Sequence, residues 1–220
     1  MKGCLRVALL LTTCTGFMNT AGAQLANPYA RPDSGATTVE KNARDDFSRF
    51  ATGGFKVLES VKGDLTGVGH ADALLVLDPP LSDPSVAREG LKRSVLLLVR
   101  DSRGDLQKAA SNLNIVPCST CAGAAGDPYA YSKIEKGHFT IVLGGGSRER
   151  WTDEYSFSYA PDTMKWLVSR VVRKVVDMDS NNQKQIEMTG KELGEISFND
   201  FDPEQLPEVT LPRFSAAPSR

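Results

Sequence analysis

The sequence has 220 residues, with 26 Lys and Arg, 27 Asp and Glu, and a formal net charge of −1. This length is typical of one domain of ordinary size. A nearly neutral chain lacks the positive charge with which proteins neutralise phosphates, so we expect no nucleic acid partner.

The first 23 residues have the three parts of a cleavable secretory signal peptide. Lys2 and Arg6 give a positive start, an apolar run follows over residues 7–11, and residues 21–23 (Ala-Gly-Ala) are a small-residue cleavage site. No apolar run in the chain reaches the roughly 20 residues needed to cross a bilayer. We therefore expect a periplasmic or secreted protein that starts at Gln24 and has no transmembrane segment.

Two other interpretations of this leader stay open. Cys14 could carry a lipid anchor, although Thr13 stands where a small residue such as Gly or Ala usually precedes a lipidated cysteine. The leader could also be a buried N-terminal helix. Cleavage would remove Lys2 and Arg6 but no acidic residue, which leaves 24 basic and 27 acidic residues and a net charge of −3.

One helix is predicted near the start of the mature chain. Residues 24–36 are rich in Pro, Gly and Ala and form a flexible lead-in. Residues 37–40 (Thr-Thr-Val-Glu) have the spacing of a helix capping box, and apolar residues then recur every three or four positions up to Phe50. Glycines 53 and 54 end the helix because glycine adopts the left-handed conformation easily.

The rest of the chain predicts β-strands. Residues 73–77 and 95–99 are continuous apolar runs, too short for typical helices, that fit central strands buried on both faces. Apolar residues alternate with polar or smaller ones over 139–143 and 155–159, which is typical of half-buried strands. We therefore expect a mostly-β domain over residues 37–201, an antiparallel sandwich or strongly twisted sheet of about 8–10 strands with one N-terminal helix. The Pro-rich tail 202–220 is expected to be extended and mostly unpacked.

The most distinctive segment runs from Lys62 to Leu77. Its residues 63–72, Gly-Asp-Leu-Thr-Gly-Val-Gly-His-Ala-Asp, resemble the G-D-x-[ND]-G-D-G-x-x-D loop of FG-GAP (integrin-α-type) and VCBS-like repeats. The resemblance implies a calcium loop between two strands, with Asp64, Thr66 and Asp72 at ligand positions. Val68 stands where the third acidic ligand belongs. We therefore expect a degenerate loop that acts as a structural turn and no cofactor, with calcium binding as the alternative.

A looser likeness extends to about residue 202. It is to uncharacterised exported bacterial proteins that carry one such loop, then a Cys-x-x-Cys segment, a Gly-rich turn and an aromatic strand. In this sequence those features are residues 118–121, 144–148 and 150–159. A propeller is not implied, because it needs several blades. The resemblance transfers no activity to these positions.

Two cysteines remain after the leader is removed, Cys118 and Cys121. Redox dithiols normally sit at a helix N-terminus, whereas Pro117 and the following Ala-Gly-Ala-Ala-Gly predict a loop. In an oxidising compartment the favoured interpretation is a structural disulfide, with a redox motif as the alternative. A zinc site would need two more ligands, and the two histidines of the chain are not closely spaced.

The usual catalytic sets lack parts. The chain has two histidines and no G-x-S-x-G motif. Asp153 and Glu154 are neighbours that point to opposite faces of a strand, so each is expected to be a solvated strand-end charge.

An aromatic row is the best candidate for recognition. Its members share one face of a predicted hairpin and are Trp151, Tyr155, Phe157 and Tyr159, with Trp166 across the turn. Most of the row is expected to be core, because aromatic rings bury large apolar areas. Trp151, Tyr155 and Trp166 are the candidate binding residues, since a partly exposed aromatic face fits a partner or ligand.

These features predict an exported, non-catalytic binding or protein-interaction protein. Its partner is expected to be another protein, for example an envelope component or a secreted toxin that it neutralises. The alternative is an envelope hydrolase that uses a carboxylate pair or a weak metal site at Asp64 and Asp72. An acidic pair at the mouth of a shared cleft would favour the hydrolase, and an exposed aromatic patch would favour the binding protein.

Overall fold

The computed structural model describes residues 47–80, 92–121 and 126–212. All of them belong to one compact unit, Arg31–Arg220. The predicted signal peptide with Cys14, the lead-in 24–36 and most of the predicted N-terminal helix lie outside the described residues.

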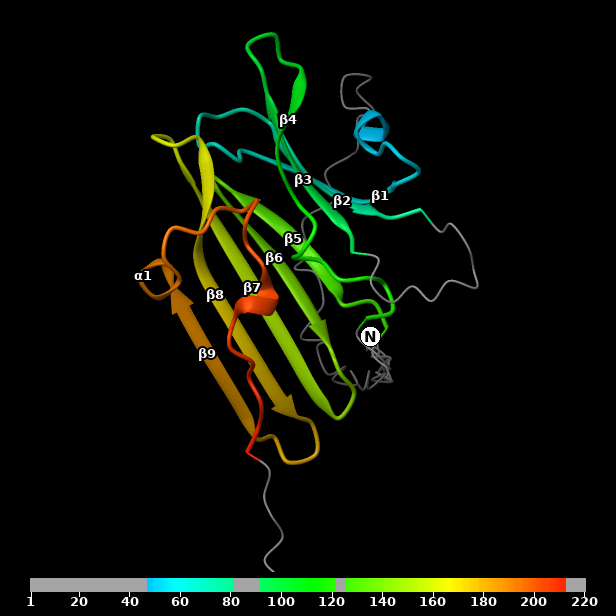
Figure 1. Cartoon of the computed structure of the whole chain (residues 1–220), viewed down its shortest axis with the longest axis vertical. Helices are drawn as coiled ribbons and strands as arrows, with labels where there is room; N and C mark the ends of the chain where they lie inside the picture. Colours follow the sequence, from blue (N-terminus) through cyan, green and yellow to red (C-terminus); the bar gives the residue numbers. More distant parts are fainter. Residues whose placement is uncertain (1–46, 81–91, 122–125, 213–220) are drawn as a thin grey trace, which may run out of the picture. The chain divides into compact units, whose positions relative to one another are not determined.

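Nine β-strands of the described part form two antiparallel sheets, and strands that follow one another in the chain are neighbours in each sheet (Figure 1). The four-stranded sheet contains β1 (Lys56–Gly63), β2 (Asp72–Asp78), β3 (Ser94–Arg100) and β4 (Leu106–Asn112). The five-stranded sheet contains β5 (Tyr129–Glu135), β6 (His138–Gly145), β7 (Glu149–Ala160), β8 (Lys165–Asp177) and β9 (Gln183–Thr189). The predicted mostly-β antiparallel architecture is confirmed.

The helical segments are short. They are η2 (Phe47–Phe50), α1 (Gly190–Leu193) and η4 (Pro203–Gln205). The segment η2 is the end of the predicted N-terminal helix, and here it is a 3-10 turn. Gly53 and Gly54 follow with φ of 68° and 83°, as expected for a glycine stop. Within the described ranges, no helix combines the length and apolar character needed to cross a membrane.

The two sheets pack face to face around one hydrophobic core. Alternate residues of β2 and β3 meet alternate residues of β6, β7 and β8. The rings of Phe139 and Phe157 stack with centroids 4.9 Å apart, and the edge of Phe198 packs 5.4 Å from each. Burying a side chain of this kind stabilises the fold by about 1.5–3 kcal/mol, so this interface is the main source of stability.

The strands β2 and β3 bury both faces, as their continuous apolar runs predicted. The residues that point away from the main core form a second cluster, which consists of Ala73, Leu75, Leu77, Leu96, Leu98 and Leu106. Phe47, Phe50, Ala51 and Phe55 pack against this cluster. The segment before β1 therefore covers the outer face of the four-stranded sheet.

A β-bulge in β8 decides which of its side chains face inward. Phe157 pairs with Val168 but Ser156 pairs with Arg170, so Ser169 is an extra residue. Its hydroxyl donates to the carbonyl of Ser156 at 3.1 Å. Because side chains alternate along a strand, one extra residue moves all later side chains to the opposite face. The inward residues beyond the bulge are Val171, Arg173 and Val175.

The chain after β4 and the C-terminal segment cover another part of the five-stranded sheet (Figure 1). The buried amide of Asn112 donates to the carbonyls of Phe198 and Phe201 at 2.6 and 2.8 Å. Leu206 packs against the main core, and Arg173 donates to the carbonyl of Pro207 at 3.0 Å. The start of the tail is therefore packed rather than free, because its apolar residues cover the sheet and its carbonyls accept from Arg173.

Candidate functional site

A cavity of about 510 Å³ lies between the five-stranded sheet, the loop after β4 and the C-terminal segment. A second cavity of about 330 Å³ shares four lining residues with it, namely Trp151, Asp153, Arg173 and Glu208. The larger is called the main chamber and the smaller the side chamber. Leu143, Ile115 and the disulfide add apolar lining to the main chamber, whereas Glu149, Val175, Val209 and Thr210 complete the side chamber.

Glycine residues position the indole of Trp151. Trp151 on β7 pairs with Gly145 on β6, and a Cβ on Gly145 would lie 2.8 Å from three atoms of the indole. The ring therefore occupies the space that a side chain would need. In the turn between β6 and β7, Gly146 has a φ of +87°, and a Cβ there would lie 1.9 Å from the carbonyl oxygen of Glu149. Both positions require glycine.

Three donors converge on Oδ2 of Asp153 in the wall shared by the chambers. Arg173 donates from Nε at 3.1 Å and from Nη2 at 2.9 Å, and the hydroxyl of Tyr155 donates at 2.8 Å. Asp153 and Arg173 are direct partners in the register of β7 and β8. Their side chains are 8% and 17% exposed, so the ion pair is largely removed from water.

Burial and the charge of Asp153 together determine the protonation states of Tyr155 and Arg173. Burial raises the pKa of Tyr155 well above its usual value, and the charge of Asp153 raises it further. Tyr155 therefore remains a neutral donor. Burial lowers the pKa of Arg173, but the hydrogen bonds and charge of Asp153 outweigh this effect and raise it. The guanidinium stays charged and holds Asp153 in place.

Two carboxylates that line the chambers, Glu149 and Glu208, belong to neither of the ion pairs found there. Lys92 and Glu204 form an ion pair of 2.9 Å at the main chamber, and Asp153 is paired with Arg173. Among the described residues, Glu149 and Glu208 take part in no ion pair. The side chamber is lined by three carboxylates and one guanidinium, which gives it a net charge of −2.

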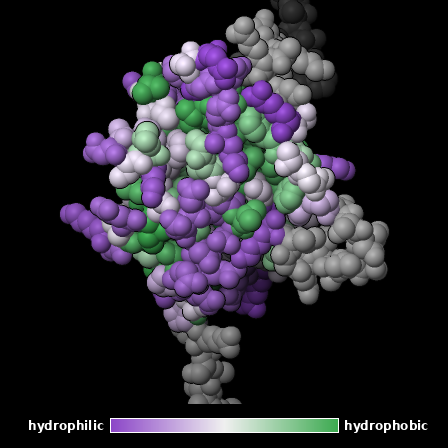
Figure 2. Space-filling model, turned by 45° about the horizontal axis from the view of Figure 1, so that its top comes forward, coloured by the Kyte–Doolittle hydropathy of each residue, from purple (hydrophilic) through white to green (hydrophobic). Residues whose placement is uncertain are grey.

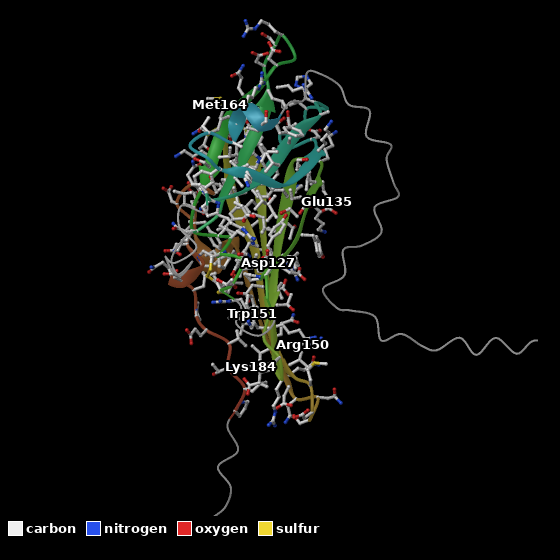
Figure 3. The ribbon with its side chains drawn as sticks, turned by 90° about the vertical axis from the view of Figure 1, so that its right-hand side faces the viewer. Asp127, Glu135, Arg150, Trp151, Met164 and Lys184 are labelled. Atoms are coloured by element: carbon white, nitrogen blue, oxygen red, sulfur yellow. A yellow bond between two sulfur atoms is a disulfide. The ribbon has the colours of Figure 1, made fainter. Side chains whose placement is uncertain are left out.

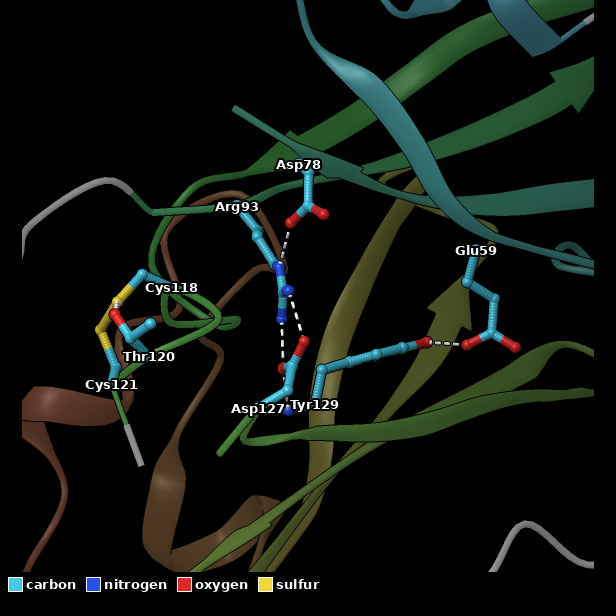
Figure 4. A network of polar contacts seen from close by, with 8 residues as sticks. All are labelled: Glu59, Asp78, Arg93, Cys118, Thr120, Cys121, Asp127 and Tyr129. Carbon is cyan, nitrogen blue, oxygen red and sulfur yellow. Dashed lines mark hydrogen bonds and ion pairs between the residues drawn. A yellow bond between two sulfur atoms is a disulfide. The ribbon is translucent and has the colours of Figure 1, made fainter. Parts of the chain in front are cut away.

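Arg93 joins the two sheets next to the main chamber (Figure 4). Its buried guanidinium bonds Asp78, at the end of β2, at 2.5 Å and both oxygens of Asp127, before β5, at 2.6 Å. Burial lowers the pKa of Arg93, but the hydrogen bonds and charges of Asp127 and Asp78 outweigh it and raise the pKa. The same view shows Tyr129, whose hydroxyl donates to Glu59 of β1 at 2.5 Å. These contacts are structural ties between the sheets.

Cys118 and Cys121 form the predicted disulfide, with an S–S distance of 2.08 Å. The two residues stand in a turn in which the amide of Cys121 donates to the carbonyl of Cys118 at 3.1 Å. In the described residues on either side of the bridge, no helix supplies the N-terminus that a redox dithiol uses. The disulfide lines the main chamber and shapes its wall.

The loop 64–71 connects β1 and β2 and contains the acidic positions that were considered for calcium. The two oxygens of Asp64 accept the backbone N–H groups of Gly67 and Gly69 at 2.7 and 2.8 Å. Those of Asp72 accept the N–H groups of Leu65 and Arg100 at 3.1 and 3.0 Å. Within the described ranges, no group of three or more His, Cys, Asp or Glu residues is placed to hold a metal ion. Amides of the loop and of Arg100 in β3 thus occupy the carboxylates that would be cation ligands.

This loop instead ties the sheets together. Leu65 is fully buried in the core, and its carbonyl accepts the indole N–H of Trp166 from β8 at 2.8 Å. The carbonyl of Asp64 accepts the N–H of Gly137 from the β5–β6 turn at 2.8 Å. A Cβ on Gly63 would lie 2.6 Å from the side chain of Ile134, so glycine allows the close approach of β1 and β5.

The structure brings two of the three candidate binding residues together. Trp151 lines both chambers and Tyr155 lines the main one, whereas Trp166 is 3% exposed in the core and packs 5.0 Å from Tyr159. The prediction that Asp153 is a solvated charge is wrong, because Arg173 lies opposite and neutralises it, which makes its burial tolerable. Arg173, Glu149 and Glu208 were not predicted as site residues.

A scan against protein-family models found no match, and neither did a search of curated proteins or a search of solved structures. Function is therefore inferred from the geometry of the chambers.

Proposed function

We propose that this chain is an exported, non-catalytic binding protein whose partner protein inserts a segment at the two chambers. The observation that carries the proposal is the shared wall of Trp151, Asp153 and Arg173. An aromatic ring beside a fixed ion pair offers apolar area and oriented polar groups, which is what a recognition site needs. Export is proposed from the pattern of the first 23 residues.

The hydrogen bonds of the site favour binding over hydrolysis. A catalytic acid or base must exchange a proton with its substrate, whereas Asp153 is held by Arg173 and Tyr155. Asp64 and Asp72, the other carboxylates considered for hydrolysis, accept backbone amides. These contacts give the carboxylates structural roles.

The molecular surface favours a recessed site. On the face in Figure 2, hydrophilic side chains predominate and hydrophobic ones occur in small scattered groups. The exposed large hydrophobic residues of the described part come from separate places in the chain and are Val57, Leu58, Val68, Leu113, Met164 and Met178. Docking surfaces usually present a contiguous apolar patch. The chambers gather apolar and polar groups in one place and are the better candidate.

A site-specific cross-link tests the proposal. A photo-reactive amino acid in place of Thr210, which lines the side chamber and is exposed, is expected to trap one protein in cells that export the chain. The matched control carries the same amino acid at Met164, which is 75% exposed and far from Trp151 in Figure 3. Trp151→Ala is expected to abolish the Thr210 adduct. Equal adducts at both positions, no adduct at Thr210, or an adduct that survives Trp151→Ala would contradict the proposal.

A further inference from the structure

We propose that the side chamber binds a cationic side chain of the partner, an ammonium or guanidinium group. This inference rests on the proposed function and names the chemistry of the group that the site receives. Four lining residues carry it: Glu149, Trp151, Asp153 and Glu208.

The charge of the chamber comes from two carboxylates on different elements. Glu149 starts β7 and Glu208 lies on the C-terminal segment, and both are exposed while lining the same space. Neither takes part in an ion pair of the described residues. Asp153 balances the charge of Arg173 by direct contact, and the charge of Glu208 also raises the pKa of Arg173 without forming an ion pair with it. The chamber thus concentrates a charge of −2 in a chain whose net charge is −1. A cation is attracted to such a space.

A buried acceptor points to the same ligand. All hydrogen bonds of Asp153 end on Oδ2, and Oδ1 accepts none from the described residues. Across those residues, no fully buried side-chain N or O atom lacks a partner, so Oδ1 reaches solvent even though the side chain is only 8% exposed. Asp153 lines both chambers, and in the proposed complex this oxygen accepts a hydrogen bond from the group that enters them. Ammonium and guanidinium groups have only donors to offer, which an ionised carboxylate needs.

Trp151 adds an aromatic wall to this acidic space. The face of an indole ring attracts a cation within about 6 Å of its centre, and indole is the strongest of the aromatic side chains in this respect. The guanidinium of Arg173 does not oppose the ligand strongly, because Asp153 and the carbonyl of Pro207 already accept from it. A space of about 330 Å³ admits the end of a lysine or arginine side chain.

Titration of the full chain with N-terminally acetylated tetralysine amide tests the inference, and the same peptide acetylated on all four Nε atoms is the matched uncharged probe. The two tryptophans give two indole N–H signals in an NMR spectrum. Tetralysine is expected to shift the signal of Trp151 saturably and to leave that of Trp166, which is buried and bonded to Leu65, in place. Acetylation removes the charge and should weaken binding about tenfold or more. Added salt should also weaken it.

Substitutions that each remove one carboxylate charge show where on the molecule tetralysine binds. Glu149→Gln and Glu208→Gln change exposed side chains and should each weaken tetralysine binding roughly threefold, as expected for single partly screened charges. Glu135→Gln, far from Trp151 in Figure 3, should leave it unchanged. Absent binding, equal binding of both peptides, or no effect of the two variants would overturn the cationic ligand. If the Thr210 cross-link persisted, the proposed function would stand without it.

Discussion

The indole of Trp151 occupies the space that a side chain at residue 145 would need. Gly145→Ala should therefore displace the ring and destabilise the fold by about 1–3 kcal/mol, the usual effect of overpacking. The displacement should move the indole N–H signal of Trp151 and weaken binding at the chambers. Chemical denaturation and NMR of the same sample measure both effects.

Gly190→Ala is the matched control for this substitution. A Cβ at Gly190 would lie 3.8 Å from its nearest neighbour, the carbonyl of Val168, and no positive φ is required there. The free energy of unfolding should change by no more than about 0.5 kcal/mol. A Trp151 signal that stays in place in Gly145→Ala would show that the glycine does not position the ring.

Neighbouring cations at residues 92 and 93 have very different surroundings. The side chain of Arg93 is 1% exposed and bonds Asp78 and Asp127, whereas Lys92 is 36% exposed and bonds the exposed Glu204. Arg93→Met should lower the free energy of unfolding by about 2 kcal/mol, because it removes the charged hydrogen bonds of a buried guanidinium, while Asp78 and Asp127 are 37% and 40% exposed and can be solvated. Lys92→Met should lower it by about 0–1 kcal/mol, as is usual for an exposed pair. Similar losses in the two variants, measured by denaturant unfolding, would contradict this difference.

At the scale of elements, the bulge at Ser169 adds one unpaired residue to β8. Deleting Ser169 would make Val168 and Arg170 consecutive residues opposite Phe157 and Ser156, so the pairing of Asp153 with Arg173 would be kept. The deletion variant is therefore expected to unfold cooperatively and to retain binding at the chambers. It should lose about 1 kcal/mol in denaturant unfolding, similar to Ser169→Ala, because both variants lose the hydrogen bond to Ser156. Loss of cooperative unfolding in the deletion variant would show that the bulge itself is needed for the fold.

A carboxylate at the β8–β9 turn makes the stability of the fold depend on pH in the acid range. Asp177 accepts the backbone N–H groups of Ser180 and Asp179, which lowers its pKa below the ordinary 3.8. A carboxylate with a lowered folded pKa stabilises the fold fully above its unfolded pKa, and the contribution disappears as the pH falls through the folded value. Burial raises the pKa of Asp72, so its contribution has the opposite sign.

Asp177→Asn should therefore flatten the acid side of the stability profile. The amide oxygen of asparagine can accept the same N–H groups but does not titrate. Melting temperatures of the two proteins should converge as the pH is lowered from about 5 to below 3, because only the wild type loses a charged acceptor. Parallel curves over that range would mean that Asp177 does not contribute to the acid dependence.

The sequence predicted the strands much better than their faces. The continuous apolar runs 73–77 and 95–99 predicted strands buried on both faces, and the two faces pack in separate clusters. The alternation 139–143 marked the side chains that enter the core correctly. The prediction that this strand is half-buried is wrong, because Thr140 and Val142 on its other face are only 7% and 4% exposed. In the sequence, the bulge in β8 is visible only as an irregular spacing between Val168 and Val171. The side of the strand on which Arg173 lies could not be predicted from that spacing, so Arg173 was not predicted as a site residue.

At the scale of the whole molecule, the disulfide is a cross-link between residues that are close in the sequence. It spans three positions in the sequence, and closing so short a loop stabilises the fold by about 2 kcal/mol. The double variant Cys118→Ala/Cys121→Ala should therefore remain folded and lose about that much in denaturant unfolding. A variant that fails to fold would show that the bridge does more than restrict the unfolded chain.

Thiol counting extends this prediction to the intact chain. Cys4 and Cys14 lie in the proposed leader, so the mature protein should contain no free thiol. A thiol reagent under denaturing conditions should leave it unlabelled, and labelling would contradict cleavage or the disulfide. Mass spectrometry of the N-terminus separates these two failures.

The site itself could not be assembled from the sequence. Trp151, Tyr155 and Asp153 share a strand, so their common face followed from period two. The other lining residues come from β8, the loop after β4 and the C-terminal segment. Their approach depends on how the two sheets pack, and the sequence contains no local signal for contacts such as that between Asn112 and Phe198. The same limit explains why Glu208 was assigned to an unpacked tail.

Each sheet consists of strands that are consecutive in the chain. During synthesis, all four strands of the first sheet, residues 56–112, therefore emerge before any strand of the second. Its hydrogen bonds can form early because they join hairpin neighbours. The inward apolar side chains of β2 and β3 remain uncovered until β6, β7 and β8 follow. A nascent chain whose first 125 residues have left the ribosome can thus form the whole first sheet with one uncovered hydrophobic face, which is the stage at which a molecular chaperone has the largest apolar surface to bind.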